Sequence, residues 1–334
     1  MNLQDNKYNQ FFLFREMLET GEIVKHLDIK KILSYEKEVK KERIFITGEG
    51  SSRIFPAKKI MYESQKKVYK EDFYTDCATQ ALEYHLLDST VFVASNSGKT
   101  KEDLELIRKL KRQNHDNIIS IVANAGTPIM NEAHVSYLLS CGKEIAVPAT
   151  KSVIEQALFY DLLFRGLNHT DLPDLNQLGN LIIQVLQIPI PEEITENLMN
   201  AKIIYFAGRN NGVAEELTLK TNEIARKKSD FLECTYLFHG VEEVMNTDEV
   251  VVIVDPFKDE EEKYKNVLVE GIGLKVVAIA TRKTIFPTSI IPEYGDFTNY
   301  LEIAAGWNLL VEVGIKMGIN MDKTVRARKV GHEF

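Results

Sequence analysis

The sequence predicts an α/β protein in which one arrangement, a parallel sheet flanked by helices, occurs twice. Short runs rich in β-branched residues alternate with longer helical stretches, which is the pattern of a parallel sheet covered by helices. Several of these runs end in glycine or serine, as strands that lead into ligand loops do. The series begins again after residue 200, and a chain of 334 residues has room for about two domains.

Composition and charge exclude several classes of protein. Hydrophobic residues make up 44% and charged residues 27% of the chain, which excludes a disordered protein. The net charge of −8 argues against a nucleic-acid partner held by a broad basic surface, although a local pocket for an anion fits it. No apolar run approaches the ~20 residues that cross a bilayer, and the N-terminus lacks the order of a secretory signal. We therefore expect a cytoplasmic protein without a membrane partner.

The three cysteines, Cys77, Cys141 and Cys234, are too few and too scattered for a disulfide framework or a zinc site. We expect the protein to use neither a metal nor a cofactor.

The first copy of the arrangement can be followed element by element. Residues 3–38 carry apolar residues at near-helical spacing, interrupted at Gly21, and predict one or two helices. The next segments predict two strands, a helix, two more strands and a long final helix. In chain order these are 43–48, 90–95, 100–113, 118–124, 134–140 and 151–167.

A connection with many turn residues, 166–191, contains a short helix over 175–186 and leads to the second copy. Strands over 202–210, 249–255 and 275–281 parallel those of the first copy, and residues 91–99 align with 250–258 without a gap. We infer an internal duplication. The predicted organisation is N-terminal helices in 1–40, a first domain in 41–170, a linker helix in 171–190, and a second domain with a C-terminal tail in 191–334.

Two loops of the first copy have the composition of a phosphate site. Residues 48–52 (GEGSS) and 95–100 (SNSGKT) each follow a strand, and their glycines and hydroxyls suit close contact with an anion at a helix N-terminus. Neither loop matches a dinucleotide fingerprint or a Walker loop. Each alone could be a solvated turn that caps a helix, but both lie where α/β proteins bind ligands. The second copy lacks the serines, so we expect one phosphate site per chain.

The segment 214–228 predicts a helix with Glu216, Lys220 and Glu223 on one face. One interpretation is a ladder of surface salt bridges. The other is a functional face, because this helix follows the GRNNG loop and begins at the ligand edge of the second sheet.

The order GxGSS, SxSGxT, VxATK (147–151) and a degenerate second copy resembles the double sugar-isomerase (SIS) domain family. The chain is similar to the isomerase domain of glucosamine-6-phosphate synthase and to fructosamine-6-phosphate deglycases. The resemblance implies two SIS domains, each a three-layer αβα, flavodoxin-like unit. It also implies a phosphate site at Ser52, Ser95, Asn96, Ser97 and Thr100, and sugar contacts at Gly50, Ser51, Val147, Ala149, Glu216 and Arg328. Asn96 stands where the family has glutamine, and Ala149 where it has serine.

The resemblance also implies catalytic residues. Glu223 takes the place of the base that moves a proton between C1 and C2 of the sugar, and Lys220 and Lys329 take the places of lysines beside it. His239 stands at the family's offset from that glutamate, where a histidine opens the sugar ring in the active site of the neighbouring subunit. A homodimer with a shared active site is therefore expected.

The expected function is aldose–ketose isomerisation of a hexose 6-phosphate or amino-hexose 6-phosphate, without a glutaminase. One alternative is a fructosamine-6-phosphate deglycase or a deaminating ketose/aldose isomerase, which would use the same Glu/His pair. Another is a sugar-phosphate sensor that binds without turnover.

Overall fold

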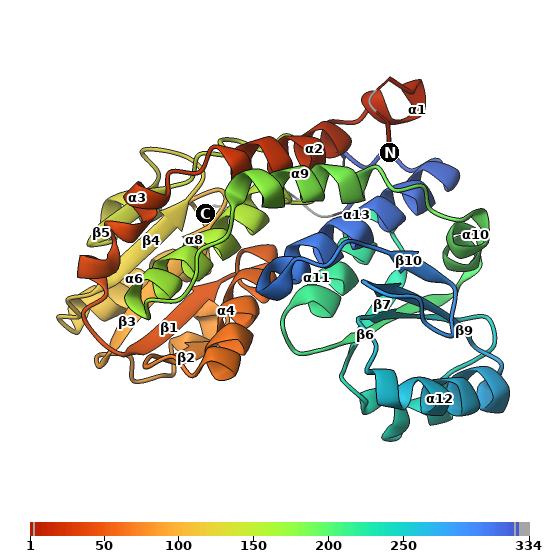
Figure 1. The fold of residues 1–334 in the computed structure, drawn as a ribbon. Coiled ribbons are helices and arrows are strands. Elements are labelled where there is room, and N and C mark those ends of the chain that lie inside the picture. Colours follow the sequence, from red (N-terminus) through yellow and green to blue (C-terminus); the bar gives the residue numbers. More distant parts are fainter. Residues whose placement is uncertain (3, 324, 327–334) are drawn as a thin grey trace.

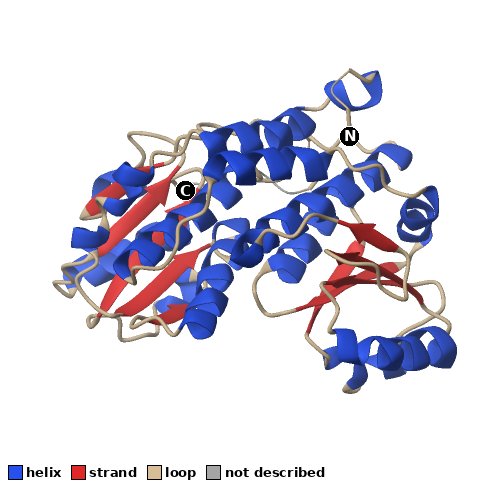
Figure 2. Ribbon diagram, viewed as in Figure 1, coloured by secondary structure: helices blue, strands red, loops and turns tan. Residues whose placement is uncertain are grey.

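The fold is described from a computed structural model, and the structure describes residues 1–2, 4–323 and 325–326. Two parallel sheets lie in separate halves of the molecule, and a layer of long helices runs over and between them (Figure 1). Each sheet carries helices on its faces (Figure 2). The predicted fold class is therefore confirmed.

The first sheet holds five strands in the order β2-β1-β3-β4-β5, all parallel. Its central strands are buried on both faces, as expected for a sheet with helices on each side. In chain order the strands are β1 (Arg43–Gly48), β2 (Asp72–Thr75), β3 (Ser89–Ser95), β4 (Ile118–Val122) and β5 (Val135–Leu138). The covering helices are α4 (Ile54–Lys67), α5 (Ala78–Ala81), α6 (Lys101–Arg112), α7 (Pro128–Glu132) and α8 (Lys151–Leu167).

The second sheet has the order β10-β9-β8-β6-β7, again all parallel. Counted from the first strand of each half, both sheets have the doubly wound order 2-1-3-4-5. The fold therefore repeats, as the duplicated pattern predicts. The strands are β6 (Ile203–Gly208), β7 (Lys228–Glu233), β8 (Val250–Val254), β9 (Lys275–Ala280) and β10 (Thr288–Ile290), with helices α11 (Val213–Lys220) and α12 (Glu261–Tyr264).

Helices from both ends of the chain join the two halves. The N-terminal α2 (Phe12–Lys25) packs along α9 (Leu175–Leu186), which packs in turn on α13 (Thr298–Lys316). The two helices α2 and α9 approach each other closely at Gly21 and Gly179. A Cβ on Gly21 would lie only 2.7 Å from the carbonyl oxygen of Gly179. The predicted interruption at Gly21 is wrong, since α2 continues through it. The remaining helices are α1 (Asn6–Asn9), α3 (Ile29–Leu33) and α10 (Glu192–Asn200).

The predicted helix over 214–228 ends earlier than expected. After α11 the chain makes a π-helical turn at Thr221–Ala225, Arg226 takes a left-handed conformation with φ of 51°, and β7 begins at Lys228. Lys228, the last residue of the predicted helix, pairs with Ile203 of β6, and this pairing overrides its helical propensity. The edge strands β2, β7 and β10 are absent from the prediction. Among the described residues, no helix is long and apolar enough to cross a membrane.

Candidate active site

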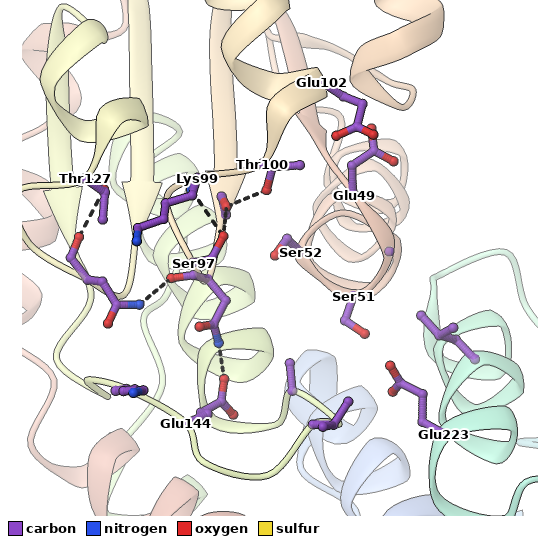
Figure 3. Close-up of a pocket in the computed structure, with 18 of the residues that line it drawn as sticks. Glu49, Ser51, Ser52, Ser97, Lys99, Thr100, Glu102, Thr127, Glu144 and Glu223 are labelled. Carbon is purple, nitrogen blue, oxygen red and sulfur yellow. Dashed lines mark hydrogen bonds between the residues drawn. The ribbon is translucent and has the colours of Figure 1, made fainter. Parts of the chain in front are cut away.

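A cavity of about 800 Å³ opens at the carboxyl edge of the first sheet, where α/β proteins bind ligands. Its lining comes from the loops that follow β1, β3 and β4 and from the loop before α8. The second half adds the end of α11 and the π-helical turn after it. These segments surround one open space (Figure 3). The residues of the two predicted phosphate loops, 49–52 and 95–100, therefore come together in one site.

The loop after β3 is organised by its own hydroxyls. Ser95 Oγ accepts a hydrogen bond from the backbone N–H of Gly98 at 3.0 Å and lies 2.8 Å from Thr100 Oγ1. Ser97 Oγ accepts from the backbone N–H of Lys99 at 3.2 Å. Gly98 has φ of +68°, and a Cβ there would lie 2.2 Å from Thr127 Oγ1, so this position requires glycine. The result is a compact turn with hydroxyls and backbone amides at the start of α6, a group suited to an oxyanion.

Asn96 has a different environment from its loop neighbours. Its Nδ2 donates to a Glu144 carboxylate oxygen and to Ser152 Oγ at 2.7 Å, while the backbone carbonyl oxygen of Asn96 accepts from Asn124 Nδ2 at 2.8 Å. The side chain therefore ties the loop to Glu144, which lies below it in Figure 3. A phosphate contact through the Asn96 amide stays a prediction, since both of its hydrogens already have acceptors.

Charged residues of α11 and of the π-helical turn after it meet the first half, and Glu223 among them lines the cavity. Lys220 Nζ donates to Ser51 Oγ and to Glu223 Oε2, both at 2.8 Å, and lies 3.4 Å from Glu216 Oε1. Lys220 and Glu216 are fully buried, whereas the Glu223 side chain keeps 27% of its surface exposed. The interpretation as a surface salt-bridge ladder is wrong, because two of its three members have no exposed surface.

Burial and charge pairing set the ionisation of this trio. Burial alone would lower the pKa of Lys220, but the carboxylates of Glu223 and Glu216 outweigh it and raise that pKa. Burial raises the pKa of Glu216, and the Lys220 ammonium opposes the rise. The cavity thus contains a carboxylate in contact with a buried ammonium. Such a pair can move a proton and stabilise a neighbouring oxyanion.

The other predicted site residues divide into three groups. Gly50, Val147 and Ala149 line the cavity, as do the phosphate-loop residues. His239 does not line it: it is exposed, directly after a 3₁₀ turn at Tyr236–Phe238 that follows β7. Arg328 and Lys329 lie outside the described residues.

Several lining residues were missed by sequence reasoning. Glu144 lies three residues before the VPATK element, and Asn124 and Thr127 follow the strand β4, a position that could have identified them. Glu49 and Glu102 lie across the cavity from Glu144 (Figure 3). Burial raises the pKa of Glu49, and the negative charge of Glu102 raises this pKa further. Two exposed lysines, Lys99 and Lys143, also line the cavity.

Within the part of the chain that the structure describes, no cluster of histidine, cysteine, aspartate and glutamate side chains has the geometry to hold a metal ion.

Comparison with known proteins gives this site a context. Residues 39–165, which carry the first sheet and most of the cavity lining, match the family model of the SIS domain. The match ends before the second sheet, so a second SIS domain stays a prediction. The chain is 25% identical, over 93% of its length, to glutamine–fructose-6-phosphate aminotransferase (isomerizing) of Methanocaldococcus jannaschii, of which it covers 30%. It therefore spans about a third of the length of the curated relatives it matches.

Solved structures share the whole fold. The C-terminal domain of glucosamine-fructose-6-phosphate aminotransferase from Francisella tularensis superposes with a TM-score of 0.78 at 20% identity, covering 96% of this chain and 100% of that one. Tagatose-6-phosphate ketose/aldose isomerase from Escherichia coli gives 0.78 at 16% identity, with 99% of each chain covered. Glucosamine-6-phosphate deaminase from Thermotoga maritima gives 0.75 at 19% identity, with 95% and 98% covered. At these identities the likeness concerns the fold.

Proposed function

We propose that this protein is a phosphosugar isomerase that interconverts the aldose and ketose forms of a hexose 6-phosphate or amino-hexose 6-phosphate. The observation that carries the proposal is the contact of Lys220 with both Ser51 and Glu223. Through this contact the acid–base residues of the second half share one cavity with the hydroxyl-bearing loops of the first half. The names of the similar proteins, which include isomerases of sugar 6-phosphates, agree with this chemistry.

The proposed mechanism divides the substrate between two groups of residues. Ser52, Ser95, Ser97, Thr100 and the amides of their loops hold the phosphate, and the sugar extends toward Glu223. The Glu223 carboxylate removes the proton from C2 of the aldose and returns it to C1, through a cis-enediol or enolamine intermediate. The Lys220 ammonium lies beside Glu223, where it stabilises the negative charge that develops on the enediolate oxygen.

Ring opening is assigned to His239 of a second copy of the chain, which makes the active site shared in a homodimer. Two apolar side chains of the same segment, Tyr236 and Val244, are 52% and 69% exposed, and this exposure supports burial of the segment against a second chain. A mixing experiment tests the assignment. Glu223→Gln and His239→Ala dimers, each inactive, should regain about a quarter of the wild-type activity after exchange of subunits, because mixed dimers contain one intact site. A mixture that stays inactive, although its subunits exchange, would exclude a shared site.

The exposed lysines Lys99 and Lys143 favour a second candidate, a deglycase or deaminating isomerase. Two cations on the cavity wall suit a substrate that carries a second anionic group, such as an amino acid joined at C1. The chemistry at Glu223 is then the same, but an amine leaves.

A panel of hexose 6-phosphates and amino-hexose 6-phosphates in deuterated water, followed by proton NMR, tests the proposal. An isomerase incorporates deuterium at C1 or C2 of at least one of them. Amine or ammonia released in step with the sugar product would indicate the deglycase or deaminase. Binding without any deuterium incorporation would leave a sugar-phosphate sensor and contradict the proposal.

A further inference from the structure

The loop between β5 and α8 forms the side of the cavity opposite the phosphate loops. Val147 and Ala149 of this loop line the cavity, and residues 143–150 contain no helix or strand. A loop without its own hydrogen-bonded structure presents its backbone to a ligand reproducibly only when other residues fix it. In this protein two buried carboxylates fix the loop by accepting hydrogen bonds from its backbone amides.

The first of these carboxylates, Glu144, is fully buried and fixes the end of the loop that leads into α8. It accepts hydrogen bonds from the backbone N–H groups of Thr150 at 2.6 Å and Lys151 at 2.8 Å, and from Ser152 Oγ at 2.6 Å. Because Glu144 also accepts from the Asn96 amide, it connects the sugar-facing loop to the phosphate loop.

The second carboxylate, Glu16, comes from α2, which lies outside the segment 39–165 that matches the SIS family model. Its two oxygens accept from the backbone N–H groups of Ile145 and, at 3.2 Å, Ala146. Glu16 is only 4% exposed, and a buried carboxylate is stabilised when such N–H groups satisfy its oxygens. Since α2 packs against α8 and α9, Glu16 is itself held in place.

We propose that Glu16 is a positioning residue for substrate recognition. By holding the amides of Ile145 and Ala146, it sets the backbone of Val147 where the sugar hydroxyls would lie. This inference rests on the proposed function, in which the sugar occupies the cavity that Val147 lines. It has a specific consequence: Glu16 supports binding of the sugar and not binding of the phosphate, because the bonds within the Ser95–Thr100 loop do not involve Glu16.

Calorimetric titration with fructose 6-phosphate and with inorganic phosphate tests this consequence. Glu16→Ala should weaken fructose 6-phosphate binding about tenfold, the effect of one or two lost hydrogen bonds, and leave inorganic phosphate binding unchanged. Glu16→Gln, which keeps one acceptor, should weaken fructose 6-phosphate binding about threefold. Glu19→Gln is the matched control, because Glu19 lies on the same helix, is 56% exposed and pairs with the Lys151 side chain rather than with the amides of the loop. It should bind both ligands as the wild type does.

The ratio of the two affinities separates positioning from mere stabilisation. If Glu16→Ala leaves this ratio unchanged, even with a lower melting temperature, Glu16 has no role in recognition and the inference is wrong. Should Glu16→Ala not fold, Glu16→Gln decides: a ratio equal to that of Glu19→Gln overturns the inference. A wild-type protein that binds inorganic phosphate but no sugar phosphate would instead overturn the proposed function, and this inference with it.

Discussion

The two sheets have the same strand order, but their carboxyl edges differ. At the first edge, the loops after β1 and β3 present serine and threonine hydroxyls to a cavity of about 800 Å³. At the second edge, Arg209 after β6 donates to both the carboxylate and the carbonyl oxygen of Asp255 after β8, and its guanidinium lies 4.3 Å from the centre of the Phe257 ring. The cavity that remains there has about 200 Å³.

This difference shows how a duplicated fold can divide one function between its copies. The first copy keeps the loops with serine and threonine hydroxyls, which are the proposed phosphate site. The second copy has an ion pair in their place and contributes α11 instead, whose charged face reaches Ser51 in the first half. In Figure 1, α11 lies between the two sheets, and it packs against α4 and the turn at Gly50–Ser52.

The largest expected effect comes from making the first edge resemble the second. Asn96→Asp introduces the residue type that the second copy has at the aligned position, Asp255. The new carboxylate would face the buried Glu144 carboxylate in place of a donated hydrogen bond. We expect a loss of about 3 to 5 kcal/mol in the free energy of unfolding, measured by urea denaturation. Asn131→Asp, at an exposed asparagine of the same half, is the control. Equal stability of the two variants would contradict the structural role of the Asn96 amide.

At the second edge, Glu302 on α13 gives stability a pH dependence. Burial raises the pKa of Glu302 from its usual 4.5 to about 7. The folded state therefore holds a proton that the unfolded state has lost, and the free energy of unfolding falls by about 3 kcal/mol as the pH rises from 4.5 to 7. Glu302→Gln removes this titration. It should match the wild type near pH 4.5 and exceed it by about 3 kcal/mol at pH 8. Parallel stability profiles for the two proteins would show that Glu302 does not titrate in this way.

A smaller effect is expected from a single hydroxyl at the first edge. Ser95→Ala removes the acceptor for the Gly98 amide and the partner of Thr100 Oγ1. Inorganic phosphate should bind about tenfold more weakly, as measured by calorimetry. Thr281→Val, which removes a hydroxyl from the edge of the second sheet, should leave phosphate binding unchanged. If the two variants behave alike, the phosphate does not bind at the first edge.

The smallest effect is expected from the ion pair at the second edge. Arg209 and Asp255 keep 24% and 40% of their side-chain surfaces exposed, so solvent screens their attraction. Asp255→Asn should change the free energy of unfolding by less than about 1 kcal/mol. Calorimetry should still give one bound phosphate per chain, since the second edge lacks the hydroxyls. A second bound phosphate would mean that the Arg209–Asp255 ion pair, and not the lack of hydroxyls, prevents phosphate binding at the second edge.

Much of the fold is readable from local patterns. Helix α9 has the predicted bounds, 175–186, because an aspartate N-cap and a clear apolar period mark it. The central strands β3, β4 and β8 are rich in β-branched residues and buried along their whole length, and the sequence predicts all three. The edge strand β7 could not be predicted from the sequence, because most of its residues are polar and it is defined by its pairing with β6.

The site could be predicted only in part, for a related reason. Its loops carry local signals in their glycines and serines. By contrast, the spacing of Glu216, Lys220 and Glu223 is the same for a surface ladder and for a buried trio, so only the tertiary fold distinguishes them. Glu16 lies about 130 positions before the amides it accepts from, and no local pattern connects residues so far apart.

In the proposed function, Glu223 acts on a ligand that the first half holds by its phosphate. The most direct test compares the wild type with Glu223→Gln for deuterium incorporation into a hexose 6-phosphate substrate, and measures phosphate affinity in the same samples. We expect the variant to lose exchange by at least about a hundredfold while it binds inorganic phosphate as tightly as the wild type. Undiminished exchange in the variant would contradict the role of Glu223, whatever its phosphate affinity.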